Sequence, residues 1–302
     1  MNRRTATAAR KTNAGAVAFE GTKIVEVGEE AALRAKYPGA EIIDARGGVI
    51  MPAFINAHTH IYSALARGLS IVGNNPTNFY EVLDGTWWAI DRHLMMDGTR
   101  ASAAALYMDS IKQGVTTIFD HHASYGEIPG TLHTIAEESK RLGLRSCLCY
   151  EVSDRDGEEK CLQAIQENAD FITECEKNKD PMLAAMFGGH ALFTISDKTF
   201  DRMVAANNGR TGYHIHVSEG MNDVYDSLQN YGRRPVQRLQ DHGILGPKTI
   251  LGHCIHVNTA EMEIIKETGT MVVNNPESNM GNAIGICPVL QLHKRGILLG
   301  MG

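Results

Sequence analysis

The chain has 302 residues, of which 43% are hydrophobic and 21% charged, and its formal net charge is -6. This composition can bury a large core and excludes a disordered chain, and no apolar run approaches the roughly 20 residues that span a bilayer. Phosphate binding needs concentrated Lys and Arg, so the acidic balance argues against nucleic acid as a principal partner. We expect a small-molecule substrate, with neither nucleic acid nor a membrane as partner.

Residues 1–14 are basic and rich in hydroxyl side chains, but they lack the apolar core of a secretory signal. An atypical or disordered start is the preferred interpretation, with a mitochondrial transit peptide as the alternative. Six cysteines in a chain of this length do not suggest a disulfide framework, so reduced thiols and a cytoplasmic location are expected. Cys147 and Cys149 fall in an expected strand, where core thiols are favoured over metal ligands.

The next segment, residues 15–50, has the pattern of short strands and turns. A hairpin is expected around Glu20-Gly21, then a short helix at 29–36, then strands at 41–44 and 49–50. So few strands cannot close a sheet alone. We therefore predict a partial β-sandwich segment that depends on further chain or on the main domain.

From residue 51 onward, strand-like apolar runs alternate with helical patterns. Strands are expected at residues 53–57, 115–119, 145–150, 182–187, 212–217, 249–251, 270–273 and 297–299. Helices are expected between them, at residues 99–112, 129–142, 158–177, 198–206, 259–267 and 288–294. Glycines such as Gly143 and Gly269 follow a helix and precede a strand, as a helix stop does. Eight such periods predict an α/β fold, a (β/α)8 TIM barrel over residues 51–302.

Histidines stand at the ends of several expected strands. His58 and His60 end the first strand, and the strand period of two points both rings to one side. Active sites of such barrels lie at the carboxyl ends of the strands, where His216 and His253 are also expected. His58, His60 and His216 then supply three nitrogens to a zinc-like ion. His214 competes with His216 for this role, but it lies two residues deeper, and a supporting role is preferred for it.

Glu219 follows His216 by three residues and is predicted to shuttle a proton between metal-activated water and the leaving group. The alternative is a surface glutamate that opens a helix. His253 is predicted to polarise the substrate or to form a hydrogen bond with the attacking water. A two-metal site would use His253 as a ligand, but residues 182–191 contain no lysine to carry a bridging carboxylate, so one divalent ion is expected.

Four motifs, in this order, resemble the amidohydrolase superfamily: Ala57-His58-Thr59-His60, His216-x-x-Glu219, Gly252-His253-Cys254 and Asn275-Pro276-Glu277-Ser278-Asn279. The subgroup is that of cytosine, guanine and S-adenosylhomocysteine deaminases and triazine chlorohydrolases. From Gly15 to the end, the chain looks most like the SsnA-type aminohydrolases. The resemblance implies a metal-dependent hydrolase barrel with an attached β-sandwich, one ion that is zinc in preference to iron, and removal of ammonia from a purine- or pyrimidine-like ring. Dimers are common in the family, so a homodimer is a further expectation.

The resemblance also implies that His190, at the end of strand four, faces the substrate, with a buried structural histidine as the alternative. Trp87 and Trp88 would lie in a loop that covers the site, Trp87 being the candidate for substrate contact, although both could equally be packing residues. His121 and His122 follow strand two and stay ambiguous, with His122 the candidate for lining the pocket.

The sequence departs from the family at strand eight. Family members carry a metal-binding aspartate there in a Gly-Thr-Asp-like motif, whereas this sequence reads Leu299-Gly300-Met301-Gly302. The last helix and the later strands of the β-sandwich are not found either. The resemblance therefore implies a truncated barrel. A catalytically inactive fragment is one alternative to a deaminase, and a hydrolase that removes chloride or an amide is another.

Overall fold

The computed structural model describes residues 15–69 and 71–302. The chain divides into two compact units, a small one that ends at Ala53 and a large one from Phe54 to Gly302. The expectation of an atypical or disordered start at residues 1–14 lies outside the described residues. Among the described residues, every helix is too short or too polar to cross a bilayer.

The small unit contains the predicted hairpin and helix. Strands β1 (Gly15–Glu20) and β2 (Lys23–Glu29) pair antiparallel, and helix α1 (Glu30–Lys36) follows. The strands predicted at 41–44 and 49–50 are wrong, because these residues have no regular structure. Their apolar side chains face solvent, Ile43 being 75% and Val49 86% exposed. A strand needs a hydrogen-bonded neighbour, and the hairpin offers these segments none.

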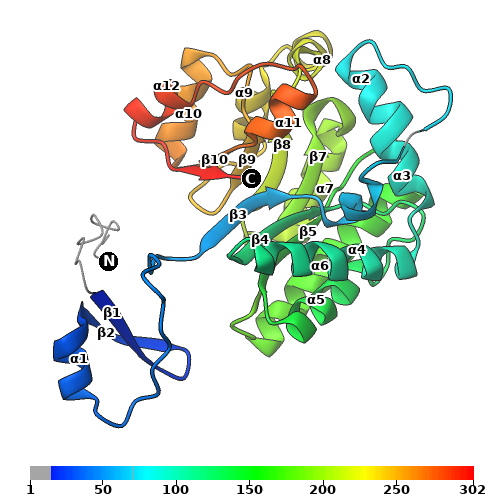
Figure 1. Ribbon diagram of the computed structural model, residues 1–302. Coiled ribbons are helices and arrows are strands. Elements are labelled where there is room, and N and C mark those ends of the chain that lie inside the picture. The colour runs from blue at the N-terminus through cyan, green and yellow to red at the C-terminus, as the bar shows by residue number, and fades with distance from the viewer. Residues whose placement is uncertain (1–14, 70) are drawn as a thin grey trace. The chain divides into compact units, whose positions relative to one another are not determined.

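Parallel strands form two sheets in the described part of the large unit (Figure 1). The first sheet contains β3 (Phe54–Thr59), β4 (Val115–His122), β5 (Arg145–Tyr150) and β6 (Leu183–Ala185), in that order. The second contains β7 (Phe187–Ala191), β8 (Tyr213–Val217), β9 (Ile250–His253), β10 (Met271–Asn274) and β11 (Leu299–Met301), in that order. The α/β class with parallel strands is therefore confirmed.

The edges of the two sheets approach each other on both sides. Met186 alone separates β6 from β7, so the single strand expected at 182–187 is divided, and a bridge joins Val152 to Gly189. On the other side β11 lies against β3, since a Cβ atom at Gly300 would meet the Cβ of Ala57 at 3.0 Å.

Helices follow most strands and lie outside them in Figure 1. The long ones are α4 (Met96–Lys112), α5 (Thr131–Leu142), α6 (Glu158–Asn178), α7 (Asp197–Asn207), α8 (Met221–Tyr231), α9 (Pro235–Asp241) and α10 (Thr259–Thr268). Short turns of helix are η1 (Ile61–Ala66), α2 (Phe79–Val82), η2 (Leu83–Trp87), α3 (Trp88–His93), η3 (Leu192–Thr194), α11 (Pro276–Gly281) and α12 (Val289–Lys294). Helices α5 and α10 end at Gly143 and Gly269, whose left-handed φ angles of 77° and 70° favour glycine.

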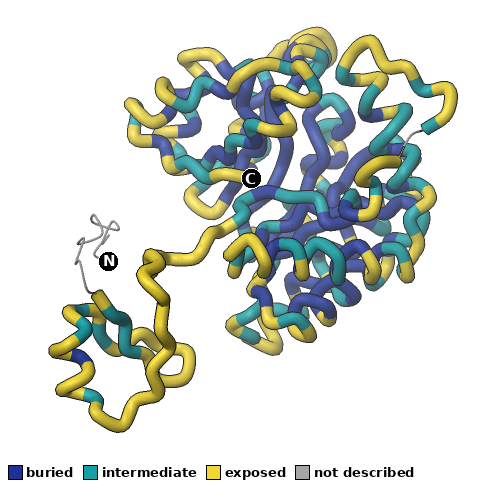
Figure 2. The backbone as a smooth tube through the Cα atoms, viewed as in Figure 1, coloured by how far each residue is buried: buried dark blue, intermediate teal, exposed yellow. Residues whose placement is uncertain are grey.

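All residues of β7, β8 and β9 are buried, and exposed residues follow the outer helices and loops (Figure 2). The six cysteines are unpaired, and Cys147 and Cys149 are buried with Met186, Ile250 and Val273.

Candidate metal centre and active site

Histidines from five strands meet at the carboxyl ends of those strands. His58 lies in β3 and His60 directly after it, His121 in β4, His190 in β7, His214 and His216 in β8, and His253 in β9. The strand register brings these ends to one level, for example by pairing Val217 with His253. The ring centroids of His58, His60 and His216 are 4.9 to 5.2 Å apart. The three histidines predicted as ligands therefore lie together.

Backbone carbonyl groups determine which nitrogen of two rings carries the proton. Nδ1 of His60 lies 2.7 Å from the carbonyl oxygen of His121, and Nδ1 of His216 lies 2.7 Å from that of His190. A carbonyl only accepts, so both Nδ1 atoms donate and both Nε2 atoms keep a free lone pair in the neutral rings. These two Nε2 atoms are 3.3 Å apart.

This arrangement fits a metal ion. Two lone pairs that face each other repel unless a cation or a proton lies between them. Zinc bonds histidine nitrogen at about 2.0–2.1 Å in tetrahedral geometry, which separates two ligand nitrogens by about 3.3–3.4 Å. The distance from His60 Nε2 to His216 Nε2 lies in this range. The residues present therefore suit a divalent ion.

His58 contributes a buried nitrogen that is free to bind. Its Nδ1 lies 2.8 Å from Nε2 of His214, which supports the ring from a deeper position, and its Nε2 has no hydrogen-bond partner among the described residues. Burial lowers the pKa of His58 and of His216 well below the usual range, which keeps both rings neutral as metal ligands must be.

The donor atoms form two overlapping sets rather than one. His58, His216 and His253 make one set, and His60, His121, Glu151 and His216 make the other, with the donor atoms of each set within 4.8 Å of one another. His58 and His60 thus fall into different sets, and His216 belongs to both.

His253 occupies a strained position beside the ligands. Its φ is 67° and that of Cys254 is 49°, values that side chains other than glycine rarely adopt. Nδ1 of His253 lies 2.7 Å from Oδ1 of Asn279 and 3.4 Å from Oε1 of Glu219. Burial lowers the pKa of His253 to about 3, so the ring is neutral, with Nδ1 donating and Nε2 free to accept.

Glu219 lies between the end of β8 and α8, close to His253. Its side chain is mostly buried, and burial raises its pKa to about 8, with the negative charges of Asp223 and Glu151 adding to the rise. A carboxyl group with a pKa near neutrality can take up and release a proton under working conditions.

His190 lies where β7 ends, and aromatic rings pack beside it. Its Nδ1 lies 2.8 Å from Oγ1 of Thr194, and its ring centroid is 5.9 Å from Trp88 and 6.0 Å from Phe193. Of the two tryptophans, Trp88 therefore reaches the site, whereas Trp87 packs against the hydrophobic core. The expected covering loop is replaced here by helices η2 and α3.

His122 does not join the cluster. Its ring packs near Tyr62 and Tyr150, and its Nε2 lies 3.1 Å from Oγ of Ser124. Neighbouring side chains of a strand point to opposite faces, and His121 takes the inward face of β4. His121, and not His122, therefore turns toward the histidine cluster, and the pocket role of His122 stays a prediction.

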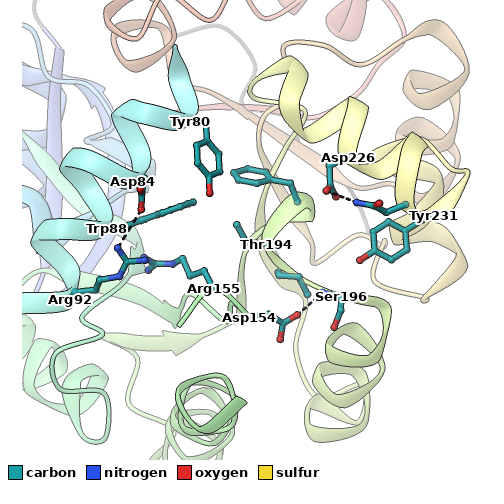
Figure 3. Close-up of a pocket in the computed structure, with 13 residues that line it drawn as sticks. Tyr80, Asp84, Trp88, Arg92, Asp154, Arg155, Thr194, Ser196, Asp226 and Tyr231 are labelled. Atoms are coloured by element: carbon teal, nitrogen blue, oxygen red, sulfur yellow. Dashed lines mark hydrogen bonds and ion pairs between the residues drawn. The ribbon is translucent and has the colours of Figure 1, made fainter. Parts of the chain in front are cut away.

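A cavity of about 480 Å³ is lined by Tyr80, Trp88 and Arg155, among other residues (Figure 3). Trp88 and Phe193 line it and also contact His190, and Tyr80 completes an aromatic wall. The Arg155 guanidinium, buried against Asp91 at 2.5 Å, lies over the Trp88 ring. The cavity offers aromatic and charged surface next to the histidine cluster.

Two residues of the site, His121 and Glu151, had no assigned role in the sequence interpretation. Glu151 comes directly after the expected strand 145–150, and an acid at that position is the signal that could have found it. His121 could have been found from the strand parity, had the end of β4 been known to within one residue.

Comparisons with known proteins identify similar sequences and similar folds. A model described as the Amidohydrolase family matches residues 49–302, and one for an imidazolonepropionase-like composite domain of bacteria matches residues 15–40. The chain is 30% identical to a 5'-deoxyadenosine deaminase of Methanobrevibacter smithii, over 95% of this chain and 63% of that protein. It is 31% identical to a 5-methylthioadenosine/S-adenosylhomocysteine deaminase of Thermococcus sibiricus, over 94% of this chain and 64% of that protein. The chain thus spans less than two thirds of the length of these relatives.

Solved structures share the fold. A zinc-bound adenosine deaminase of Xanthomonas campestris superposes with a TM-score of 0.79 at 24% identity, over 95% of this chain and 64% of that chain. Guanine deaminase of E. coli gives a TM-score of 0.81 at 18% identity, over 95% and 67%.

Proposed function

The chain belongs to the amidohydrolase family, and on this premise we propose that it hydrolyses a non-peptide C–N bond, removing ammonia from a purine-like ring. The observation that carries the proposal is the pair of unprotonated Nε2 atoms of His60 and His216, 3.3 Å apart, with the unpartnered Nε2 of His58 beside them. The deaminase names of the relatives direct the proposal to adenosine-type nucleosides.

We propose that residues 51–302 form a (β/α)8 barrel and that residues 15–50 belong to a small β-sandwich. The bridge between Val152 and Gly189 and the approach of Gly300 to Ala57 support closure of the barrel. The composite-domain match over 15–40 supports the second assignment. A cytoplasmic location, which the unpaired cysteines support, and a homodimer are part of the same proposal.

His58, His60 and His216 would hold one divalent ion through their Nε2 atoms, with zinc preferred to iron. A bound ion of this kind lowers the pKa of a water molecule toward neutrality and polarises the substrate. The neighbouring carbonyl groups already hold the His60 and His216 rings in the tautomer that binds metal.

The other residues handle protons and orient the substrate. Glu219 takes a proton from the attacking water and returns it to the amino nitrogen, while a C–O bond forms at the ring carbon, the C–N bond breaks and ammonia leaves. Nε2 of His253 accepts a hydrogen bond from that water. Nε2 of His190 accepts one from an N–H group of the substrate, and the adjoining cavity receives the rest of the nucleoside.

The test is ammonia release by the purified chain with zinc or iron. The substrates are 5'-deoxyadenosine, 5'-methylthioadenosine, S-adenosylhomocysteine and guanine, with chloride release from a chlorotriazine as a parallel assay. We expect metal-dependent ammonia release from at least one purine substrate. Stoichiometric metal without any turnover would favour the inactive-fragment alternative, and chloride release alone would favour the other leaving group.

A further inference from the structure

Glu151 is a buried carboxylate that the proposed reaction does not use. It follows β5, is 2% exposed, and imidazole rings surround its side chain. Its Oε1 lies 2.9 Å from Nδ1 of His121 and 3.3 Å from Nδ1 of His60, and its Oε2 lies 3.8 Å from Nε2 of His190. Burial of a carboxylate is costly unless such partners compensate it, so this position needs a reason.

Glu151 is placed behind His60 rather than beside the ion. It approaches Nδ1 of His60, the nitrogen that donates to the carbonyl of His121, whereas Nε2 on the other side of the ring faces His216. The four donor atoms of this set lie close together, but the carboxylate contacts the nitrogen that does not bind the ion. Glu151 is thus a partner of the ligand and not a ligand.

Glu151 also contacts His60 indirectly, through His121. Nε2 of His121 lies 3.1 and 2.9 Å from the carbonyl oxygens of Gly189 and His214, so it must donate. Nδ1 of His121 therefore faces Glu151 with one proton shared between them. This pair fixes the His121 residue, whose own carbonyl oxygen accepts from His60. The carboxylate acts on His60 both directly and through the backbone of His121.

We propose that Glu151 is a positioning residue that orients His60 as a metal ligand. The inference rests on the proposed function in so far as His60 binds the ion. Partners of this kind, which hold the distal nitrogen of a ligating histidine, typically change metal affinity 10- to 100-fold when removed.

The experiment compares Glu151→Gln with Glu167→Gln in the full chain. Glu167 is an equally buried acid, 4% exposed, that accepts hydrogen bonds from Gly130 and Leu132 on the outer helices. Zinc dissociation constants are measured by competition with a chromogenic chelator, alongside melting temperatures. We expect Glu151→Gln to weaken zinc binding by about 10- to 100-fold, and Glu167→Gln to lower the melting temperature without changing zinc affinity.

Each outcome has a separate meaning. A folded Glu151→Gln chain with wild-type zinc affinity overturns the positioning role, and a wild-type chain that binds no zinc overturns the proposed function instead. Cobalt(II) loading separates positioning from ligation: an unchanged visible band shape in Glu151→Gln supports positioning, whereas a changed coordination spectrum makes Glu151 a ligand and overturns the proposal. If Glu151→Gln does not fold, Glu151→Asp is used instead. It keeps the negative charge, but its shorter side chain holds the carboxylate further from His60 and His121. The same loss of zinc affinity is expected.

Discussion

At the residue scale, the site depends on which nitrogen of each imidazole carries a proton. Carbonyl oxygens of His121 and His190 hold the protons of His60 and His216 on Nδ1, and Asn279 does the same for His253. The backbone at the strand ends thereby leaves the Nε2 atoms of His60 and His216 unprotonated and 3.3 Å apart. Such a prepared donor set reduces the cost of ordering the ligands when metal arrives.

The role of Glu219 predicts a specific loss of rate. Glu219→Gln keeps the size of the side chain but removes its ability to carry a proton, so kcat should fall by about 10²- to 10⁴-fold. Zinc content should stay unchanged, since Glu219 is not among the proposed ligands. The measurement is steady-state ammonia release with metal analysis of the same sample. Glu159→Gln, on the exposed face of α6, is the control; equal rates for both variants would contradict the shuttle role.

Trp88 predicts a change in substrate affinity. Its ring contacts His190 and lines the cavity, and its indole N–H has no partner among the described residues. Aromatic contacts are worth about 0.5–1.5 kcal/mol, so Trp88→Phe should raise KM by roughly 2- to 10-fold. Trp87→Phe, one residue away and packed against the core, should leave KM within about twofold. A larger KM effect for the Trp87 variant would show that the cavity is not the substrate's binding site.

The sequence predicted which three histidines lie together, but it did not predict every side chain beside them, and the reason is structural. His58, His60 and His216 could be placed because an apolar strand visibly ends at each, and strand ends of an α/β fold share one edge. His121 and His122 could not be told apart because the expected strand ended at residue 119, whereas β4 continues to His122 and its period of two turns His121 inward. Trp87 was chosen over Trp88 as the candidate because the segment was expected to be a loop. It forms helices η2 and α3, and the helical geometry decides which ring turns inward.

At the element scale, the hydrophobic periodicity of the sequence located helices and strands well where the element buries one face. Helices α4 to α7 lie within a few residues of their expected positions, and β4 extends three residues further, to His122. Helices α8 and α9 were not among the expected helices, and the strands at 41–50 did not form. Pairing partners far away in the chain determine such elements, and the local pattern does not contain them.

Arg238 allows the contribution of helix α9 to the stability of the site to be measured. It is 1% exposed and donates to the carbonyl groups of Leu192 and Ile195, which bracket the segment that carries Thr194, the partner of His190. Arg238→Met removes the side-chain donor of the Ile195 carbonyl and leaves the Leu192 carbonyl with only the 3.4 Å bond from the Ile195 N–H, at about 1–3 kcal/mol for each lost bond. We expect the free energy of unfolding to fall by about 2–5 kcal/mol in urea titrations.

The matched control is Arg233→Met. Arg233 pairs with Asp241 at the surface, where its side chain is 60% exposed. An exposed pair contributes about 0–1 kcal/mol, so this variant should unfold almost as the wild type does. Similar losses in both variants would remove the basis for assigning a supporting role to α9.

At the scale of the whole molecule, a bound ion should stabilise the large unit as a body. The ligands come from β3 and β8, strands of different sheets, so metal binding ties the two sheets together. Zinc at 100 times its dissociation constant should add about 2.7 kcal/mol, which corresponds to a rise of roughly 5–10 °C in melting temperature for a unit of this size. Differential scanning calorimetry with zinc and with chelator measures this rise.

Two substitutions make this stabilisation specific. His216→Ala should abolish the rise because His216 belongs to both donor sets, whereas His93→Ala, in α3 outside both sets, should preserve it. A rise of the same size in the His216 variant would mean that zinc binds elsewhere on the chain.

The most direct test of the central claim is anomalous diffraction at the zinc edge from crystals of the chain grown with zinc. We expect one strong peak within bonding distance of Nε2 of both His60 and His216, with their Nδ1 atoms still hydrogen-bonded to the carbonyls of His121 and His190. A peak elsewhere, or no peak with the two rings turned apart, would contradict it.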